Sequence, residues 1–234
     1  LRGLPQGFDY SAVLPGQGHY YNPDFIINGI KERIEGYVTS VTTNLALDWL
    51  KNKREKTQPF LMLYHQKAPH RNWKPEEKYL RLFDDKTFDP PANFFDDYSN
   101  RGTAAKSQEM LIAASEEQIA AAHGNGGHGR WGHDFKMLTD PYGNATGFER
   151  ELERFNPEQK QAWLDAYTPK NEAMKSMNLQ GQELALWKFN RYLKDYLRTI
   201  QSVDDGVGEV LNYLDQEGLT ENTIVVYTSD QGFY

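Results

Sequence analysis

The sequence contains no cysteine among its 234 residues. Disulfides and thiolate zinc sites are therefore excluded within it, although the redox compartment stays open. It also lacks an apolar run close to the roughly 20 residues that span a bilayer. The sequence has no surplus of basic residues either, since it contains 26 Lys and Arg and 33 Asp and Glu, which gives a net charge of -7. A general nucleic-acid binder, which carries a basic stripe, is excluded on that ground.

An initiator methionine and a signal segment are also missing, so we expect the native N-terminus to lie upstream of Leu1. Aromatic residues, in contrast, are abundant at 13%, with 14 tyrosines and 5 tryptophans. Such rings dominate ordinary core packing. Under the alternative interpretation, some of them line a carbohydrate site, where flat amphipathic rings stack on sugars. Composition alone leaves both interpretations open.

Hydrophobic periodicity predicts two helix–strand pairs. The stretch 37–53 places apolar residues on one helical face, and the apolar run 59–66 that follows has the length of a strand buried on both faces. A long helical pattern over 183–216 is followed, after Gly218, by a second apolar run at 222–229. Helix, short turn and strand in this order form half of an α/β repeat. We therefore predict an α/β fold in which both strands lie parallel in one sheet.

The remaining segments are predicted from turn and helix signals. These signals predict a loop with short extended pieces over 1–26, loops over 84–101 and 123–135, and helices over 108–122 and 157–166. His123, His128 and His133 sit among the glycines of the third loop. A second metal site is one interpretation of these histidines. A substrate loop or a plain surface loop is favoured over it, because a flexible backbone must first be ordered before it binds a metal.

Polar side chains follow both predicted strands. His65, Lys67 and His70 follow the first run, and Asp230 and Gln231 follow the second. Parallel strands would bring these groups to one edge, where open α/β sheets bind ligands. A carboxylate and an amide oxygen suit Ca²⁺ or Mg²⁺, and a lysine with a histidine suits an oxyanion, so the pattern points to a phosphate or sulfate ester. A turn-forming acid and a merely exposed histidine are the alternatives.

Two linked motifs carry a family resemblance. PFLMLYHQKAPHRNW contains an apolar strand followed by Ala-Pro-His and an aromatic residue, and SVDDGVGEVLNYLDQEGLTENTIVVYTSDQGFY contains Val-Asp-Asp and Thr-Ser-Asp-Gln-Gly. Together they resemble the sulfatase family of the alkaline-phosphatase superfamily. The resemblance implies a mostly parallel central sheet flanked by helices, incomplete in this chain. It also implies that 1–234 is the central part of the catalytic domain, with about 85–180 as a variable, insertion-like region.

The resemblance further implies roles for individual residues. Asp230 and Gln231 match metal ligands that hold Ca²⁺, which is favoured over Mg²⁺. His70 matches the catalytic histidine that contacts the sulfate group. Lys67 is assigned to substrate binding, although it has no fixed counterpart in the family and a solvated loop lysine is an equal alternative.

Several family elements are missing from the sequence. The family nucleophile is a formylglycine made from Cys or Ser in a Cys/Ser-x-Pro-x-Arg motif, which does not occur here, and the upstream Asp ligands and the Gly-Lys-x-His motif are also missing. Asp204 and Asp205 match a structural pair on a helix and do not replace those ligands. We therefore expect the formylglycine to lie upstream, the chain to be an internal fragment, and this fragment alone to be inactive.

The N-terminal stretch GQGHYYNPDFIINGIKER resembles the N-acetylglucosamine-6-sulfatase branch of the family. His19, Tyr20 and Tyr21 would then line the sugar pocket, with loop packing as the alternative. The implied function is a sulfuric ester hydrolase of glycosaminoglycan degradation, acting on a sulfated glycan that carries 6-O-sulfated N-acetylglucosamine. A phosphodiesterase or phosphonate hydrolase on the same scaffold, and a catalytically dead glycan-binding relative, are the alternatives. Family members are exported, which implies a periplasmic, lysosomal or secreted site; no nucleic-acid partner and no membrane span are expected.

Overall fold

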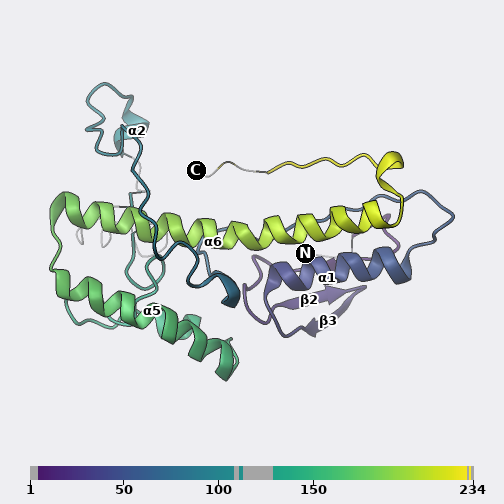
Figure 1. The fold of residues 1–234 in the computed structure, drawn as a ribbon, viewed down its shortest axis with the longest axis horizontal. Coiled ribbons are helices and arrows are strands. Elements are labelled where there is room, and N and C mark those ends of the chain that lie inside the picture. The colour runs from purple at the N-terminus through teal and green to yellow at the C-terminus, as the bar shows by residue number, and fades with distance from the viewer. Residues whose placement is uncertain (1–4, 108–110, 113–128, 231, 233–234) are drawn as a thin grey trace.

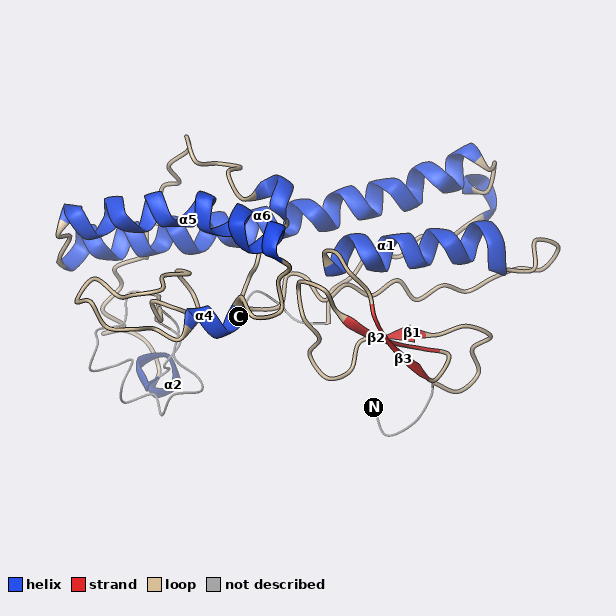
Figure 2. Ribbon diagram, turned by 90° about the horizontal axis from the view of Figure 1, so that it is seen from below, coloured by secondary structure: helices blue, strands red, loops and turns tan. Residues whose placement is uncertain are grey.

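The structure is organised along one long helix, α6 (Gly181–Gln216), as Figure 1 shows. The computed structural model describes residues 5–107, 111–112, 129–230 and 232. Helix α1 (Val38–Asp48) packs against the C-terminal half of α6, and α5 (Pro157–Met177) runs beside its N-terminal half (Figures 1 and 2). The shorter helices are η1 (Trp49–Lys53, a π-helix), η2 (Glu77–Tyr79), α2 (Thr103–Ser107), α4 (Phe148–Glu151) and η3 (Thr220–Asn222).

A small antiparallel sheet lies beside α1, on the side away from α6 (Figure 2). It contains β1 (Ala12–Val13), β2 (Asp24–Ile27) and β3 (Ile30–Arg33) in the order β1-β2-β3. Asn28 and Gly29 join β2 to β3, with φ angles of 47° and 91°. Positive φ at both positions is typical of a two-residue hairpin turn, which Asn-Gly favours. The sequence analysis expected short extended pieces only up to residue 26 and did not predict the hairpin.

Helices α1 and α6 approach each other closely at Gly206. A Cβ atom at this position would lie 2.5 Å from Oγ1 of Thr43 and 2.7 Å from the hydroxyl oxygen of Tyr64. These two hydroxyls are hydrogen-bonded to each other at 2.6 Å, and Thr43 also donates to the carbonyl of Thr39. The missing side chain at position 206 therefore allows the helix crossing and the polar contacts beneath it.

Replacing Gly206 by alanine should lower the free energy of unfolding by about 1–3 kcal/mol, because the added methyl group overpacks this crossing. The effect should appear although alanine is the better helix former by about 1 kcal/mol. Gly208→Ala is the matched control, since a Cβ at Gly208 meets no atom within 4 Å. Urea unfolding followed by circular dichroism should show stabilisation of the control by about 0.5–1 kcal/mol. Equal effects of the two substitutions would contradict the close approach.

The ends of the two long helices carry recognisable signals. Asn156 caps α5 by accepting from the amide of Gln159, whose side chain reaches back to the Asn156 amide, and Pro157 occupies the first turn. The helix predicted for 157–166 is confirmed and continues to Met177. Gly218 adopts a φ of 65° just after α6, as predicted for the residue that ends it.

The two apolar runs at 59–66 and 222–229 are not strands among the described residues, so the prediction of two paired parallel strands is wrong for this part of the chain. Both runs are extended, except that residue 222 ends η3, but Leu61 and Ile224 are 75% and 92% exposed. A strand of a parallel sheet needs hydrogen-bonded neighbours and helices over its faces. Within the described residues the one sheet is β1-β2-β3, and it pairs with neither run.

Aromatic side chains form much of the core. One cluster contains Tyr20, Tyr21, Phe25, Tyr37, Phe148, Trp163 and Tyr167, and a second contains Trp73, Trp131, Phe135 and Tyr192. Core packing therefore accounts for these abundant rings. Most of the helix predicted over 108–122, and the glycine-rich stretch up to residue 128, lie outside the described residues, whereas 84–101 is irregular as predicted. No helix in the described parts is both long and apolar enough to cross a membrane.

A buried ionic network ties the segment around Lys136 to α5 and α6. Asp195 on α6 is fully buried and accepts a hydrogen bond from the Tyr167 hydroxyl at 2.6 Å. Nη1 of Arg198 lies 2.9 Å from the same carboxylate, and Nζ of Lys136 lies 3.4 Å from it. Residues within the 85–180 region thus share one core with the long helix. The assignment of that region as a variable insertion stays a prediction.

Candidate functional site

One cavity, of about 170 Å³, collects most of the predicted site residues. We call it the basic cavity. The residues that form its wall are Gln17, Gly18, His19, Tyr20, Lys67, His70, Arg71, Asn72, Lys74 and Glu151. The loop before β2 supplies the first four residues, the turn after the extended run 59–66 supplies the next five, and α4 supplies the last. The structure therefore brings together His19, Tyr20, Lys67 and His70, whereas His65 is not part of this wall.

The turn that carries Lys67 and His70 is fixed against α6. The backbone amide of His70 donates to the carbonyl of Lys67 at 3.0 Å. The indole nitrogen of Trp73 donates to the carbonyl of Pro69 at 2.5 Å, within the same turn. The Trp73 ring is buried and lies edge-on to Tyr192 of α6, with 4.4 Å between the ring centroids. The placement of the turn thus depends on the packing of the long helix.

The His70 ring is exposed to the basic cavity in a defined tautomer. Its Nδ1 contacts the carbonyl of Arg71. Because a carbonyl oxygen only accepts, Nδ1 carries the proton, and Nε2 is the ring atom that remains for a ligand. When both nitrogens are protonated, Nε2 becomes a donor suited to an oxyanion. The carbonyl of His70 itself accepts a hydrogen bond from the Tyr20 hydroxyl at 2.5 Å.

Lys67 is the cation of the cavity whose charge is least compensated. Its ammonium lies 4.8 Å from the centroid of the Tyr20 ring, a cation–π distance. No carboxylate of the described residues forms an ion pair with Lys67. Burial, and to a smaller degree the neighbouring charge of Lys74, lowers the pKa of Lys67 to about 8. A half-buried ammonium without a counter-ion is a suitable partner for one anionic group.

The other two cations of the cavity are already paired. Arg71 donates through Nε and Nη2 to the two oxygens of Asp134, both at 2.8 Å, and Lys74 lies 2.5 Å from Glu151. Burial alone would raise the pKa of Asp134, but hydrogen bonds from His133 and Arg71 keep it well below its usual range. The carboxylate is therefore ionised and holds the guanidinium firmly. These two pairs leave Lys67 as the cation of the cavity that is available to attract an anion.

The predicted sugar-binding residues differ in exposure. His19 is exposed, and burial followed by the charge of Arg154 lowers its pKa, which favours the neutral ring near pH 7. Tyr20 lines the cavity but is only 2% exposed. Tyr21 points into the core, where its hydroxyl donates to the carbonyl of Pro75 at 2.6 Å. His19 is thus accessible to a sugar, whereas Tyr21 and most of the Tyr20 surface are packed inside the protein, as in the loop-packing alternative.

The predicted metal ligands lie at the end of the C-terminal extended run. Asp230 is exposed, and Gln231 falls outside the described residues. In the described ranges, no group of three or more His, Asp or Glu residues has a geometry that could hold a metal ion. Asp205 accepts hydrogen bonds from Lys78 and Tyr79 and so ties η2 to α6, in agreement with its expected structural role.

The histidines of the glycine-rich stretch are only partly described. His123 and His128 lie outside the described residues, so the idea that they bind a metal is untested. His133 is described, and its Nδ1 lies 3.1 Å from the Asp134 carboxylate that pairs with Arg71. His133 therefore supports the wall of the basic cavity.

Six residues of the cavity wall were not predicted from the sequence: Gln17, Gly18, Arg71, Asn72, Lys74 and Glu151. All but Glu151 lie within four positions of His19 or His70 in the chain, so proximity to a predicted site residue was the signal that could have identified them. Glu151 lies 77 positions from Lys74, with which it pairs, and no local pattern marks it.

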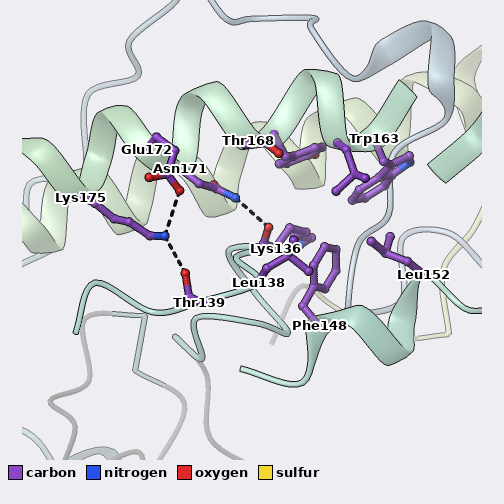
Figure 3. A pocket seen from close by; sticks show the side chains of 12 residues that line it. Lys136, Leu138, Thr139, Phe148, Leu152, Trp163, Thr168, Asn171, Glu172 and Lys175 are labelled. Atoms are coloured by element: carbon purple, nitrogen blue, oxygen red, sulfur yellow. Dashed lines mark hydrogen bonds and ion pairs between the residues drawn. The ribbon is translucent and has the colours of Figure 1, made fainter. Parts of the chain in front are cut away.

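A second cavity, of about 230 Å³, lies between α5 and the segment 136–152 (Figure 3). Apolar side chains that line it are Leu138, Phe148, Leu152, Trp163 and Leu164. At one end, Lys175 donates to Thr139 at 2.7 Å and pairs with Glu172 at 2.9 Å, so its charge is compensated. This cavity contains none of the predicted site residues, and the chemistry of the described chain is concentrated in the basic cavity.

Comparison with known proteins identifies the family. A sequence model of the family described as Sulfatase matches residues 5–234. The chain belongs to the sulfatase family. The N-acetylglucosamine-6-O-sulfatase of Bacteroides thetaiotaomicron is 41% identical to this sulfatase chain over 236 residues, covering 98% of the chain and 40% of the relative. The N-acetylglucosamine-6-sulfatase of Capra hircus is 25% identical over 242 residues, covering 100% of the chain and 30% of the relative.

The fold of the chain matches a solved structure. A protein bound to its substrate D-glucosamine-2-N,6-O-disulfate superposes with a TM-score of 0.85 and 39% sequence identity, covering 99% of this sulfatase chain and 45% of that protein. The fold is therefore of the α/β, alkaline-phosphatase/sulfatase class, as predicted from the sequence, although the described residues contribute helices and an antiparallel sheet. The chain spans less than half the length of each of these proteins.

Proposed function

We propose that the protein to which this sulfatase chain belongs hydrolyses the 6-O-sulfate ester of N-acetylglucosamine in sulfated glycans, as part of glycosaminoglycan degradation. The names of the two relatives support the sugar and the ester position, and the substrate of the solved structure supports a sulfated glucosamine. These sulfated sugars are also the partners we expect. Export to the periplasm, the lysosome or the cell exterior follows from the same family membership and stays part of the proposal.

The observation that carries the proposal is the basic cavity. It combines the ammonium of Lys67, which has no carboxylate partner in the described part of the chain, with an imidazole on His70 whose Nε2 is available. Lys67 would bind the charge of the sulfate group, and His70 would donate from Nε2 to a sulfate oxygen as charge develops in the transition state. Neutral His19 at the rim would hydrogen-bond a sugar hydroxyl. Each role uses one residue that the sequence analysis selected.

The groups that the family uses beside these residues are part of the proposal. When bound, Ca²⁺ would act as a Lewis acid on the sulfate oxygens, and a formylglycine would supply the nucleophile. The donor chemistry of Asp230 and Gln231 suits Ca²⁺, because carboxylate and amide oxygens are hard ligands. The described residues, however, form no group of three or more His, Asp or Glu that could hold a metal ion, so Asp230 offers only part of a site. The steps above therefore use the residues of the basic cavity alone.

The test compares esters on one sugar. The intact protein should release sulfate from N-acetylglucosamine-6-sulfate faster than from the 3-sulfate, and faster than it releases phosphate from the 6-phosphate. Ion chromatography measures the sulfate and the phosphate released. Preferential release of phosphate would favour a phosphate-ester hydrolase on the same scaffold over a sulfatase. Binding of the 6-sulfate without turnover would favour a catalytically dead relative.

A further inference from the structure

Tyr20 contacts both of the residues to which the proposed function gives a role on the sulfate group. Its hydroxyl donates to the backbone carbonyl of His70 at 2.5 Å, and the centroid of its ring lies 4.8 Å from the Lys67 ammonium. The ring is 2% exposed and stacks on Tyr37, with 6.0 Å between centroids and 22° between planes. Burial also keeps the pKa of Tyr20 far above its ordinary value, so the hydroxyl stays protonated and acts as a donor. The side chain is therefore fixed and reaches two site residues at once.

We infer that Tyr20 is a positioning residue of the sulfate-binding site, which holds the Lys67 ammonium with its ring and the His70 turn with its hydroxyl. This inference deepens the proposed function and rests on it. It also changes the role expected from the sequence, where Tyr20 was a candidate for direct sugar contact. Because the ring is almost wholly buried, it offers a sugar little surface. Its contacts with Lys67 and His70, in contrast, are both present in the structure.

The two contacts are chemically separate, so two substitutions distinguish them. Tyr20→Phe keeps the aromatic face under Lys67 and removes the hydrogen bond to His70. Tyr20→Leu removes both contacts and leaves an apolar side chain. A cation–π contact stabilises the charged form of a lysine, so its loss in an apolar surrounding lowers the pKa of that lysine. The pH dependence of the reaction therefore reports on the ring and not on the hydroxyl.

The other charged groups that face Lys67 in the basic cavity are not substituted in these variants. Lys74 and Arg71 keep their partners Glu151 and Asp134, and His19 and His70 keep their side chains. The pKa of Lys67, about 8, is assigned to the alkaline limb of the profile. Above its pKa, Lys67 is neutral and loses its attraction for the sulfate group. A shift of the alkaline limb therefore identifies a change at Lys67.

The experiment measures kcat, KM and the pH profile of kcat/KM for N-acetylglucosamine-6-sulfate with the intact enzyme. Tyr20→Phe should lower kcat by about 3- to 10-fold, as expected for one lost hydrogen bond, with an unchanged alkaline limb. Tyr20→Leu should raise KM as well and move the alkaline limb down by about half a unit to one unit. Tyr21→Phe is the matched control, since it removes an equally buried hydroxyl that contacts Pro75 and should leave the profile unchanged.

A purely structural role of Tyr20 predicts another result, in which both variants lose activity without any shift of the alkaline limb. That result, or the same shift in Tyr21→Phe, would overturn the inference. A second readout does not depend on turnover: NMR titration of the Lys67 side chain should give a lower pKa in Tyr20→Leu than in the unmodified protein. If the unmodified enzyme fails to hydrolyse the ester, the proposed function fails, and the NMR titration still decides whether Tyr20 holds Lys67.

Discussion

Replacing Asp195 by asparagine should lower the free energy of unfolding by about 3–5 kcal/mol, the range found when one partner of a buried ion pair is removed. Asp195 has no exposed surface, and its carboxylate compensates the charges of Lys136 and Arg198, each of which is 1% exposed. Asparagine keeps the size of the side chain and removes the charge. The loss therefore arises chiefly from the buried Lys136, whose ion pair is with Asp195, and not from a cavity, whereas Arg198 keeps its second pair with Asp84 at 2.6 Å.

Chemical denaturation of the Asp195→Asn variant at pH 7 measures this effect. Asp204→Asn is the matched control, because Asp204 lies on the same helix, is exposed, and forms no ion pair among the described residues. The control should change the free energy of unfolding by less than about 0.5 kcal/mol. Similar losses in both variants would show that the effect comes from the charge of the helix and not from the buried network.

The pH dependence gives a second test of the same network. Burial alone would raise the pKa of Asp195, but Lys136, Arg191 and Arg198 lower it below its ordinary value. A carboxylate with a depressed folded-state pKa stabilises the protein above its unfolded-state pKa, near 3.9, and loses that contribution as the pH falls through the folded-state value. The stability difference between the unmodified protein and Asp195→Asn should thus be constant from about pH 5 to pH 7. It should shrink only below about pH 4.

This network also shows where sequence patterns stop being informative. The helical period of α6 was visible in the sequence, and so were its start, its end and the glycine that follows it. The burial of Asp195 was not, because an acid on a long helix is most often solvated. Its partner Lys136 lies on a distant segment, and only the packed structure brings the two together at 3.4 Å. The same reason hid Glu151 and Asp134 beside the site.

The site turn and the sheet illustrate the two other cases. The motif around His70 was recognised from local residues, and the structure places Lys67 and His70 in one cavity. Asn28 and Gly29 carry a local turn signal, but the hairpin of β2 and β3 around them was not predicted. The strand predicted for 59–66 depends on partners, because the hydrogen bonds of a strand belong to its neighbours. An apolar run indicates only that its side chains need to be buried, and it does not identify the segments that bury them.

Replacing His70 by alanine should lower kcat/KM for N-acetylglucosamine-6-sulfate by about 10²- to 10³-fold, as expected for the loss of one preorganised donor to an oxyanion. The His70 ring contacts the backbone of the turn only through Nδ1, at the carbonyl of Arg71. The substitution therefore leaves the backbone carbonyl of residue 70, which accepts from Tyr20, in place. His65→Ala is the matched control, since His65 lies on the same segment but does not line the basic cavity. It should leave kcat/KM nearly unchanged.

Asp230→Ala should have a different signature from His70→Ala in the intact enzyme. Asp230 is predicted to be a charged ligand of Ca²⁺, so its loss should abolish activity and weaken calcium binding, as measured by isothermal titration calorimetry. His70 is predicted to contact the sulfate group, so His70→Ala should bind calcium as the unmodified enzyme does while its turnover falls. Addition of a chelator should then reproduce the Asp230→Ala result and not the His70→Ala result. Equal loss of calcium binding in the two variants would show that the roles of these residues have been assigned wrongly, because only the substitution of a metal ligand should weaken the binding of the ion.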